Sequence, residues 1–110
     1  MTSKDKQILN KVIKEIDVLT EIIKGMSFDE FTKREEIKRA TAMTLINIGE
    51  LIKIASKELK DSAPHIPWNE IMATRNIAAH GYHALKLGLI WTTVKEDVPQ
   101  LKLDIQNLIK

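Results

Sequence analysis

Apolar residues recur every three or four positions along most of this chain, which is the spacing of one face of an α-helix. The first such pattern predicts an amphipathic helix over roughly residues 4–24, closed by Gly25. Ser27 and Glu30 then have the spacing of a capping box, in which each side chain caps the other residue's backbone. A long second helix is expected to start afresh near Lys33, and its apolar stripe continues to Leu59.

The second half of the chain contains two further helical patterns. A connection with two prolines precedes Trp68, near which a third helix starts, and Gly81 is a residue type that can end it. The last helical stretch covers roughly residues 86–109. Within it, Pro99 either kinks the helix or lies in the first turn of a new helix capped by Asp97. No strand-like alternation competes, so the chain is expected to be an all-α, antiparallel bundle of four to five helices.

Composition supports one folded domain over residues 1–110, because 44% of the residues are hydrophobic and 29% are charged. The net charge of +2 does not predict a strongly basic nucleic-acid-binding surface. The absence of cysteine excludes disulfides, thiolate zinc sites and cysteine nucleophiles. Because no apolar run reaches the ~18–20 residues that cross a bilayer, and the first residues are polar, we expect a cytoplasmic protein without membrane contact.

One segment concentrates groups that can bind or transform a phosphate, namely Arg75, Asn76, His80 and Tyr82. On a helix Asn76 and His80 share a face, whereas Arg75 lies roughly 140° away from His80 around the axis. Two copies of this helix meeting across a twofold axis would bring each arginine near the partner's histidine. Metal-free RNA cleavage needs a base, an acid and a cation, which such a dimer supplies. Spacing alone favours surface and packing roles instead.

Glu50 and the remaining histidines are weaker candidates. Glu50 follows an apolar stretch of the second helix and could pair with Arg75, although a plain surface charge is equally compatible with its position. His83 could pair with His80 as a metal ligand, but the sequence offers no obvious third ligand. His65 lies in the proline-containing connection and is expected to be solvated.

Basic and aromatic residues elsewhere are expected to have structural roles. Glutamates interrupt the basic residues near the start of the second helix, which favours a solvated face over an RNA-binding surface. Both tryptophans adjoin apolar stripe residues and are expected to anchor the core or an interface. The residues concerned are Lys33, Arg34, Lys38, Arg39, Trp68 and Trp91.

Several segments occur in an order that is specific to a known family. Ile48-Gly49-Glu50 lies on the long helix, and Pro64-His65-Ile66-Pro67-Trp68-Asn69-Glu70-Ile71 precedes the Arg75-x4-His80-x-Tyr82 pattern. Ile90-Trp91-Thr92-Thr93-Val94 and Asp97-Val98-Pro99-Gln100-Leu101 follow it, with Val98 in place of a leucine. Through these segments the chain resembles the HEPN superfamily, and within it the HepT branch, the toxin half of MNT–HEPN toxin–antitoxin systems.

The resemblance implies a helical, homodimeric ribonuclease that acts on RNA and needs no metal or other cofactor. It implies that Arg75 and His80 are the catalytic pair and that Asn76 orients the phosphate or His80. Glu50, through its pairing with Arg75, is the second supporting candidate. Tyr82 matches the tyrosine to which the partner nucleotidyltransferase antitoxin transfers AMP, which silences the toxin. The added negative charge and bulk would repel RNA from the groove. A dimer of this kind could assemble further with its antitoxin.

The sequence therefore predicts a metal-independent endoribonuclease toxin that uses Arg75 and His80 at a dimer interface. The 2′-hydroxyl of RNA would attack the adjacent phosphate, leaving a 2′,3′-cyclic phosphate and a 5′-hydroxyl. One alternative is a non-catalytic helical module that binds or regulates a partner nucleotidyltransferase. A further alternative is a metal-dependent phosphohydrolase built from Glu50, His80 and His83.

Overall fold

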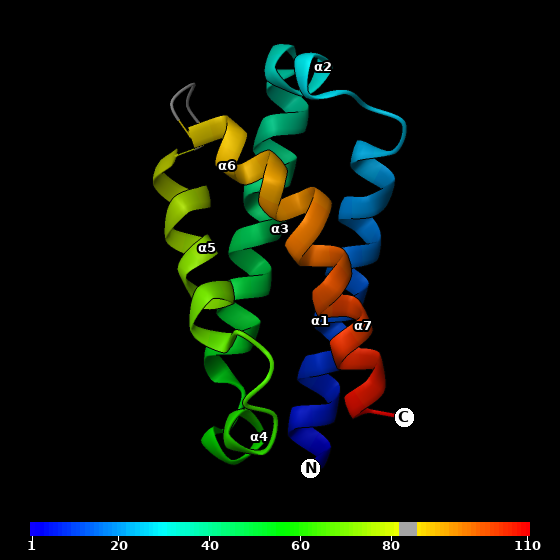
Figure 1. The fold of residues 1–110 in the computed structure, drawn as a ribbon, viewed down its shortest axis with the longest axis vertical. Coiled ribbons are helices and arrows are strands. Elements are labelled where there is room, and N and C mark those ends of the chain that lie inside the picture. Colours follow the sequence, from blue (N-terminus) through cyan, green and yellow to red (C-terminus); the bar gives the residue numbers. More distant parts are fainter. Residues whose placement is uncertain (82–85) are drawn as a thin grey trace.

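The chain folds into an up-and-down bundle of α-helices, as the apolar periodicity predicts (Figure 1). The computed structural model describes residues 1–81 and 86–110, and all regular secondary structure within these ranges is helical. The elements are α1 (Ser3–Ile23), α2 (Phe28–Lys33), α3 (Glu35–Ile54), α4 (Lys57–Ser62), α5 (Trp68–Gly81), α6 (Leu87–Thr92), the π-helical η2 (Thr93–Asp97) and α7 (Val98–Leu108).

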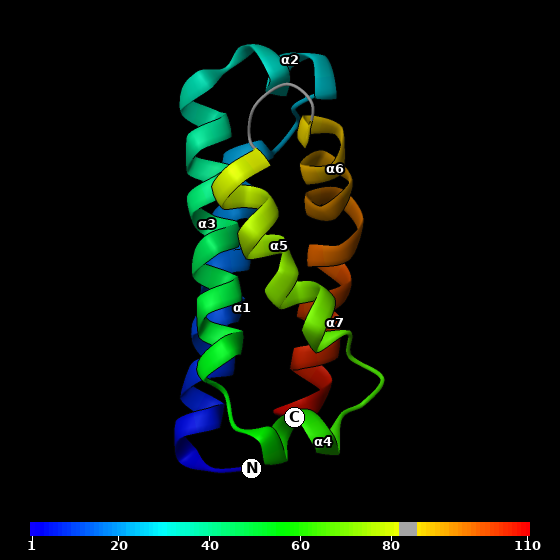
Figure 2. The same ribbon diagram turned by 90° about the vertical axis from the view of Figure 1, so that its left-hand side faces the viewer.

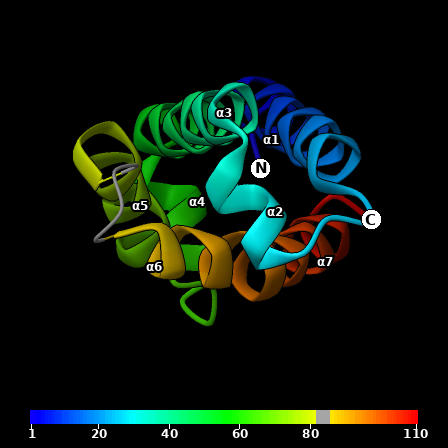
Figure 3. The same ribbon diagram turned by 90° about the horizontal axis from the view of Figure 1, so that it is seen from above.

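Four antiparallel helical segments surround one apolar core. Seen from above, α1, α3, α5 and the continuous α6–η2–α7 segment form a ring, and α2 covers its upper end (Figure 3). Leu9, Val12 and Ile16 on α1 face Leu45, Ile48 and Ile52 on α3, and Ile90 and Ile105 close the ring from the last segment. Both termini lie at the opposite end, beside α4 (Figures 1 and 2). Within the described ranges, every helix is too short or too polar to traverse a bilayer.

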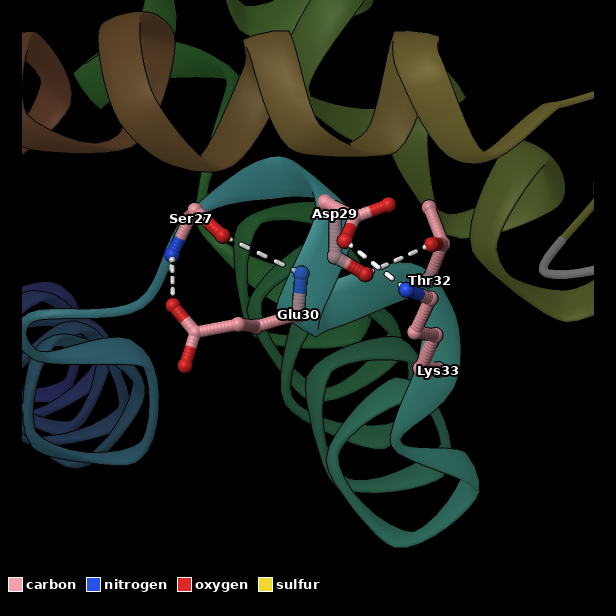
Figure 4. Close-up of polar contacts among 5 residues, drawn as sticks. All are labelled: Ser27, Asp29, Glu30, Thr32 and Lys33. Carbon is pink, nitrogen blue, oxygen red and sulfur yellow. Dashed lines mark hydrogen bonds and ion pairs between the residues drawn. The ribbon is translucent and has the colours of Figure 1, made fainter.

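The predicted boundaries around α2 are confirmed. Gly25 follows α1 with a φ of 72°, a left-handed conformation that glycine adopts without steric cost. Ser27 Oγ accepts from the Glu30 amide at 3.1 Å, and Glu30 Oε1 accepts from the Ser27 amide at 3.0 Å (Figure 4). Within the same turn, Lys33 pairs with Asp29 at 2.9 Å. This capping box fixes the direction in which the chain enters α2.

The prediction of one continuous stripe to Leu59 is wrong, because α3 ends at Ile54 and a separate α4 follows. Ser56 caps α4 through a 3.1 Å bond from the Leu59 amide to its hydroxyl. The carboxylate of Asp5, only 3% exposed, accepts from both the amide and the hydroxyl of Ser56. These two bonds lower the pKa of Asp5 from its ordinary 3.8. The break thus depends on a partner 51 positions away in the sequence.

The C-terminal segment is helical throughout, but it contains one wide turn. Pro99 does lie in the first turn of α7, whereas Asp97 has helical dihedral angles and makes no capping hydrogen bond. Of the two alternatives that the sequence left open, the helix capped by Asp97 is therefore wrong. Proline cannot donate to the carbonyl four residues before it, and its ring crowds that carbonyl. The helix accommodates the proline through η2. In η2 the Val98 amide donates to the carbonyl of Thr93, five residues earlier, which is the hydrogen bond of a π-helical turn.

Both tryptophans have the core-anchoring role that the sequence predicts. Trp68 is 6% exposed, and its indole N–H donates to the Ala63 carbonyl at 3.0 Å. Trp91 is half-buried and lies with its ring centre 4.9 Å from that of Phe31 on α2. These contacts attach the proline-containing loop and α2 to the bundle, so the tryptophan rings are not available as an exposed stacking platform.

Candidate active site

The candidate site lies where α5 packs along α3, on the outer side of the bundle (Figure 2). The two helices approach closely at Gly49: a Cβ placed there would lie 2.6 Å from Arg75 Cβ. Real side chains do not come this close, so only glycine allows α5 to pack here. The tripeptide Ile48-Gly49-Glu50 therefore combines a buried core residue, a contact point for α5 and an outward carboxylate.

Arg75 is held in a defined orientation by two neighbours. Its Nε donates to Glu50 Oε1 at 2.7 Å, and its Nη1 donates to Asn76 Oδ1 at 3.2 Å. The second terminal nitrogen, Nη2, has no hydrogen-bond partner among the described residues. The pairing of Glu50 with Arg75 is one of the two possibilities that the sequence left open. The pair is half-exposed, with 47% of the Glu50 side chain and 42% of the Arg75 side chain accessible, so it lies open to a ligand.

A surface pocket of about 370 Å³ opens beside this pair. Gly49, Glu50 and Lys53 line it from α3, and Asn69, Arg75 and Asn76 line it from α5. A guanidinium with free N–H groups, an ammonium and two amides suit an anion with several oxygens, such as a phosphodiester. The sequence reasoning missed Lys53, which follows Glu50 by three residues and therefore shares its face of α3.

His80 is exposed on the last turn of α5 and is not among the residues that line the Arg75 pocket. Its position five residues after Arg75 turns it away from the guanidinium, as helix geometry predicts. Asn76 lies on the exposed face, close to Arg75. Tyr82 and His83 lie outside the described residues. The protomer thus assembles Arg75, Asn76 and Glu50, and the roles of His80 and Tyr82 stay predictions.

The same groove between α3 and α5 continues as a small apolar depression of about 180 Å³. Met43 and Ile46 of α3 and Ala78 and Ala79 of α5 line it, and Met43 is 57% exposed. Small side chains on α5 leave room there for another helix to approach. The sequence signal for this surface is the pair Ala78-Ala79 directly before His80.

The other candidates have the roles that the sequence favours. The basic residues near the start of α3 form ion pairs with Asp29, Glu35 and Glu36. Lys33, Arg34 and Arg39 make a solvated face, as expected, whereas the side chain of Lys38 is only 16% exposed. His65 is exposed in the loop before α5. In the part of the chain that the structure describes, no three His, Asp or Glu side chains gather closely enough to hold a metal ion.

The fold and the site together define a class of protein, a helical bundle that presents an oriented arginine on its third long helix, α5. Comparison with known proteins identifies the family. Residues 12–108 match the family model described as ribonuclease HepT-like. The chain belongs to this family. It is 30% identical over 110 residues, the full length of both proteins, to a probable ribonuclease HepT of Thermococcus cleftensis.

Two further relatives have similar names. A candidate RNase of Caldanaerobacter subterraneus subsp. tengcongensis is 30% identical over 93% of this chain and 91% of its own. Another candidate RNase, from Methanocaldococcus jannaschii, is 30% identical over 96% of this chain and 87% of its own. No solved structure matches the chain. The matches confirm the family that the sequence motifs indicated.

Proposed function

We propose that this chain is a metal-independent endoribonuclease of the HepT type and the toxin of a toxin–antitoxin pair. The observation that carries the proposal is the orientation of Arg75, which Glu50 and Asn76 hold at the rim of an open pocket. An arginine that served only to tie α3 to α5 would not need an additional acceptor on its own helix or a neighbouring anion-sized pocket. Membership of the HepT-like ribonuclease family supports the same role.

The reaction is a transesterification, in which the 2′-oxygen replaces the 5′-oxygen on phosphorus. One His80 accepts the proton of the 2′-hydroxyl as the 2′-oxygen bonds to the adjacent phosphorus. The His80 of the other protomer donates a proton to the 5′-oxygen as its bond to phosphorus breaks. Arg75 stabilises the charge on the phosphorane oxygens. Histidine suits both proton transfers, because its pKa near 6.5 keeps both protonation states populated at neutral pH.

A homodimer is needed because one protomer does not bring His80 to the Arg75 pocket. We infer that the partner's α5 packs against the α3–α5 groove, where Met43, Ile46 and Ala79 offer an apolar surface. Such an arrangement would place both copies of His80 beside the two arginines. The cognate nucleotidyltransferase would silence the site by transferring AMP to Tyr82, two residues after His80 in the sequence.

The direct test compares RNA cleavage by the parent protein with that of His80→Ala and Arg75→Ala, all in the presence of EDTA. We expect each substitution to lower the rate by about 10²–10⁴-fold, the usual effect of removing a proton-transfer group or a phosphate-binding cation. Lys11→Ala is the control, since it removes an exposed basic side chain of α1 that lines neither the Arg75 pocket nor its larger neighbour. Full activity of His80→Ala would overturn the mechanism. An inactive parent that still binds a nucleotidyltransferase would favour the non-catalytic alternative.

A second experiment tests the shared site. Parent and His80→Ala protein are mixed in varying ratio at constant total concentration, with time for subunits to exchange. If each site needs both histidines, activity follows the square of the parent fraction, because every mixed dimer is inactive. Activity that is linear in the parent fraction would show that each protomer works alone.

A further inference from the structure

A line of positive charge continues from Arg75 toward the α4 end of the bundle. Lys53 of α3 lines the same pocket as Arg75 and follows Glu50 by about one helical turn. Lys60 of α4 lies next, with its ammonium 3.4 Å from the backbone carbonyl of Lys53. The three cations therefore succeed one another along one side of the molecule, although they come from three different helices.

Lys53 and Lys60 are not neutralised, in contrast to their neighbours. Glu50 pairs with Arg75, and Lys57 pairs with Asp61 at 2.6 Å. No carboxylate in the described part of the chain forms an ion pair with Lys53 or Lys60. Lys60 donates to a carbonyl at the C-terminal end of α3, where a positive charge stabilises the helix by interacting with its dipole. That bond uses one of the three ammonium N–H groups and leaves the charge available to an anion.

The second and larger pocket begins where the Arg75 pocket ends. It has a volume of about 710 Å³, and Asn69 lines both pockets, which makes them neighbours. Lys60 and His65 line the larger pocket together with the ion pair of Lys57 and Asp61, and Glu70 forms no ion pair within the described residues. The lining offers no exposed tryptophan, tyrosine or phenylalanine ring for base stacking, since Trp68, the one such residue in it, is 6% exposed. Cations and an amide along an open groove suit the phosphates of a sugar–phosphate backbone.

We propose that Lys53 and Lys60 bind phosphates of the RNA strand that flank the scissile one. Through these contacts, longer RNA strands bind with higher affinity than short ones. The inference rests on the proposed function, because it assigns the scissile phosphate to Arg75. Binding through the backbone alone gives no preference for a base sequence. The two lysines are thus substrate-positioning residues that lie outside the Arg75–His80 chemistry.

The first test measures binding of a fluorescent single-stranded RNA of about twelve nucleotides. The strand is 2′-O-methylated so that it cannot be cleaved. The variant is Lys53→Ala/Lys60→Gln, in which the glutamine amide can still donate to the end of α3. The control is Lys11→Ala/Lys14→Ala, which removes two exposed lysines of α1 that form no ion pair in the described ranges and line none of the pockets. Thermal unfolding checks that all proteins fold.

Salt dependence gives the expected magnitude. Each phosphate contact on a single strand contributes a slope of about −0.7 to the dependence of log affinity on log salt. When the salt concentration falls from ~200 to ~50 mM, the affinity of both proteins increases. Because the variant has lost two contacts, its increase should be about seven-fold smaller than that of the parent. The control should match the parent. Equal slopes for variant and parent, or equal losses for variant and control, would overturn the proposal.

The second test measures cleavage of unmodified RNAs of increasing length. The ratio of parent kcat/KM to variant kcat/KM should increase from a dinucleotide to the longer strands. The difference between parent and variant should lie in KM. A ratio that is the same for all lengths would mean that the substitutions damage the Arg75 site itself, which overturns the proposal. Loss of antitoxin binding with unchanged RNA affinity would assign the surface to a protein partner instead. A parent that cleaves no RNA would refute the proposed function, while the binding test still decides the role of the lysines.

Discussion

Gly49→Ala is the substitution whose effect follows most directly from the geometry. The added methyl carbon would lie 2.6 Å from Arg75 Cβ, whereas carbon atoms in contact prefer about 3.5–4.0 Å. Because the obstructing atom is next to the α5 backbone, a simple rotamer change cannot relieve the clash. The helices must separate by about 1 Å, and Arg75 moves with α5.

Two opposing free energies decide the stability of this variant. Overpacking in a tight contact costs about 1–3 kcal/mol, and replacing glycine by alanine within a helix contributes up to about 1 kcal/mol of stability. Gly88→Ala is the matched control, because a Cβ at Gly88 in α6 meets nothing within 4 Å. The difference in unfolding free energy between the two variants should therefore equal the clash itself, about 1–3 kcal/mol.

Chemical denaturation of both variants measures this difference, and RNA cleavage measures its consequence for the site. A displacement of about 1 Å at a reacting group can lower a rate by about 10²-fold. We expect Gly49→Ala to lose activity in this range, while Gly88→Ala keeps the parent rate. If Gly49→Ala were as stable and as active as Gly88→Ala, the close approach of α3 and α5 would not be what positions Arg75.

Two further predictions concern single carboxylates. Asp5→Asn should lower the unfolding free energy by about 1–3 kcal/mol at neutral pH, because Ser56 loses a charged acceptor. Since the folded-state pKa of Asp5 is lowered from 3.8, this stabilisation is present above that pH and is lost as the pH falls below it. Urea titrations should therefore show a smaller difference in unfolding free energy between parent and variant at pH ~2.5 than at pH ~7. An equal difference at both pH values would contradict the assignment. Glu50→Gln should change the unfolding free energy by less than about 1 kcal/mol, because the Arg75 pair is half-exposed. Its kcat for RNA should nevertheless fall by about ten-fold, and an unchanged kcat would show that Glu50 does not position Arg75.

Local signals predicted the helices well, and long-range contacts explain where they failed. Apolar spacing and the Ser27 capping box placed α1, α2 and α5 close to their observed bounds. The break after Ile54 was hidden, because buried Ala55 and Leu59 continue the stripe across it. Only the folded chain shows that Asp5 reaches Ser56 and stabilises the break. The π-turn before Pro99 likewise depends on the helix continuing on both sides.

The candidate site divides in the same way. Helix geometry alone indicated that Arg75 and His80 point in different directions, and the structure places only Arg75 at the pocket. Pairing with Glu50 could be raised but not decided from the sequence, since it needs α3 and α5 to be adjacent. The role of Gly49 was invisible, because a glycine inside a helix signals a close approach without naming its partner. Lys53 became a candidate only once the pocket was described.

The position of the two termini has a practical consequence for anyone who handles this protein. Both ends of the chain lie at the α4 end of the bundle, where Lys60 also lies, and His80 is at the far end of α5 (Figure 1). Mobile charges on an affinity tag would act within the ~8 Å screening length of physiological buffers. A polyhistidine or acidic tag would then add its own electrostatic contribution to RNA binding, so affinities should be measured on tag-free protein.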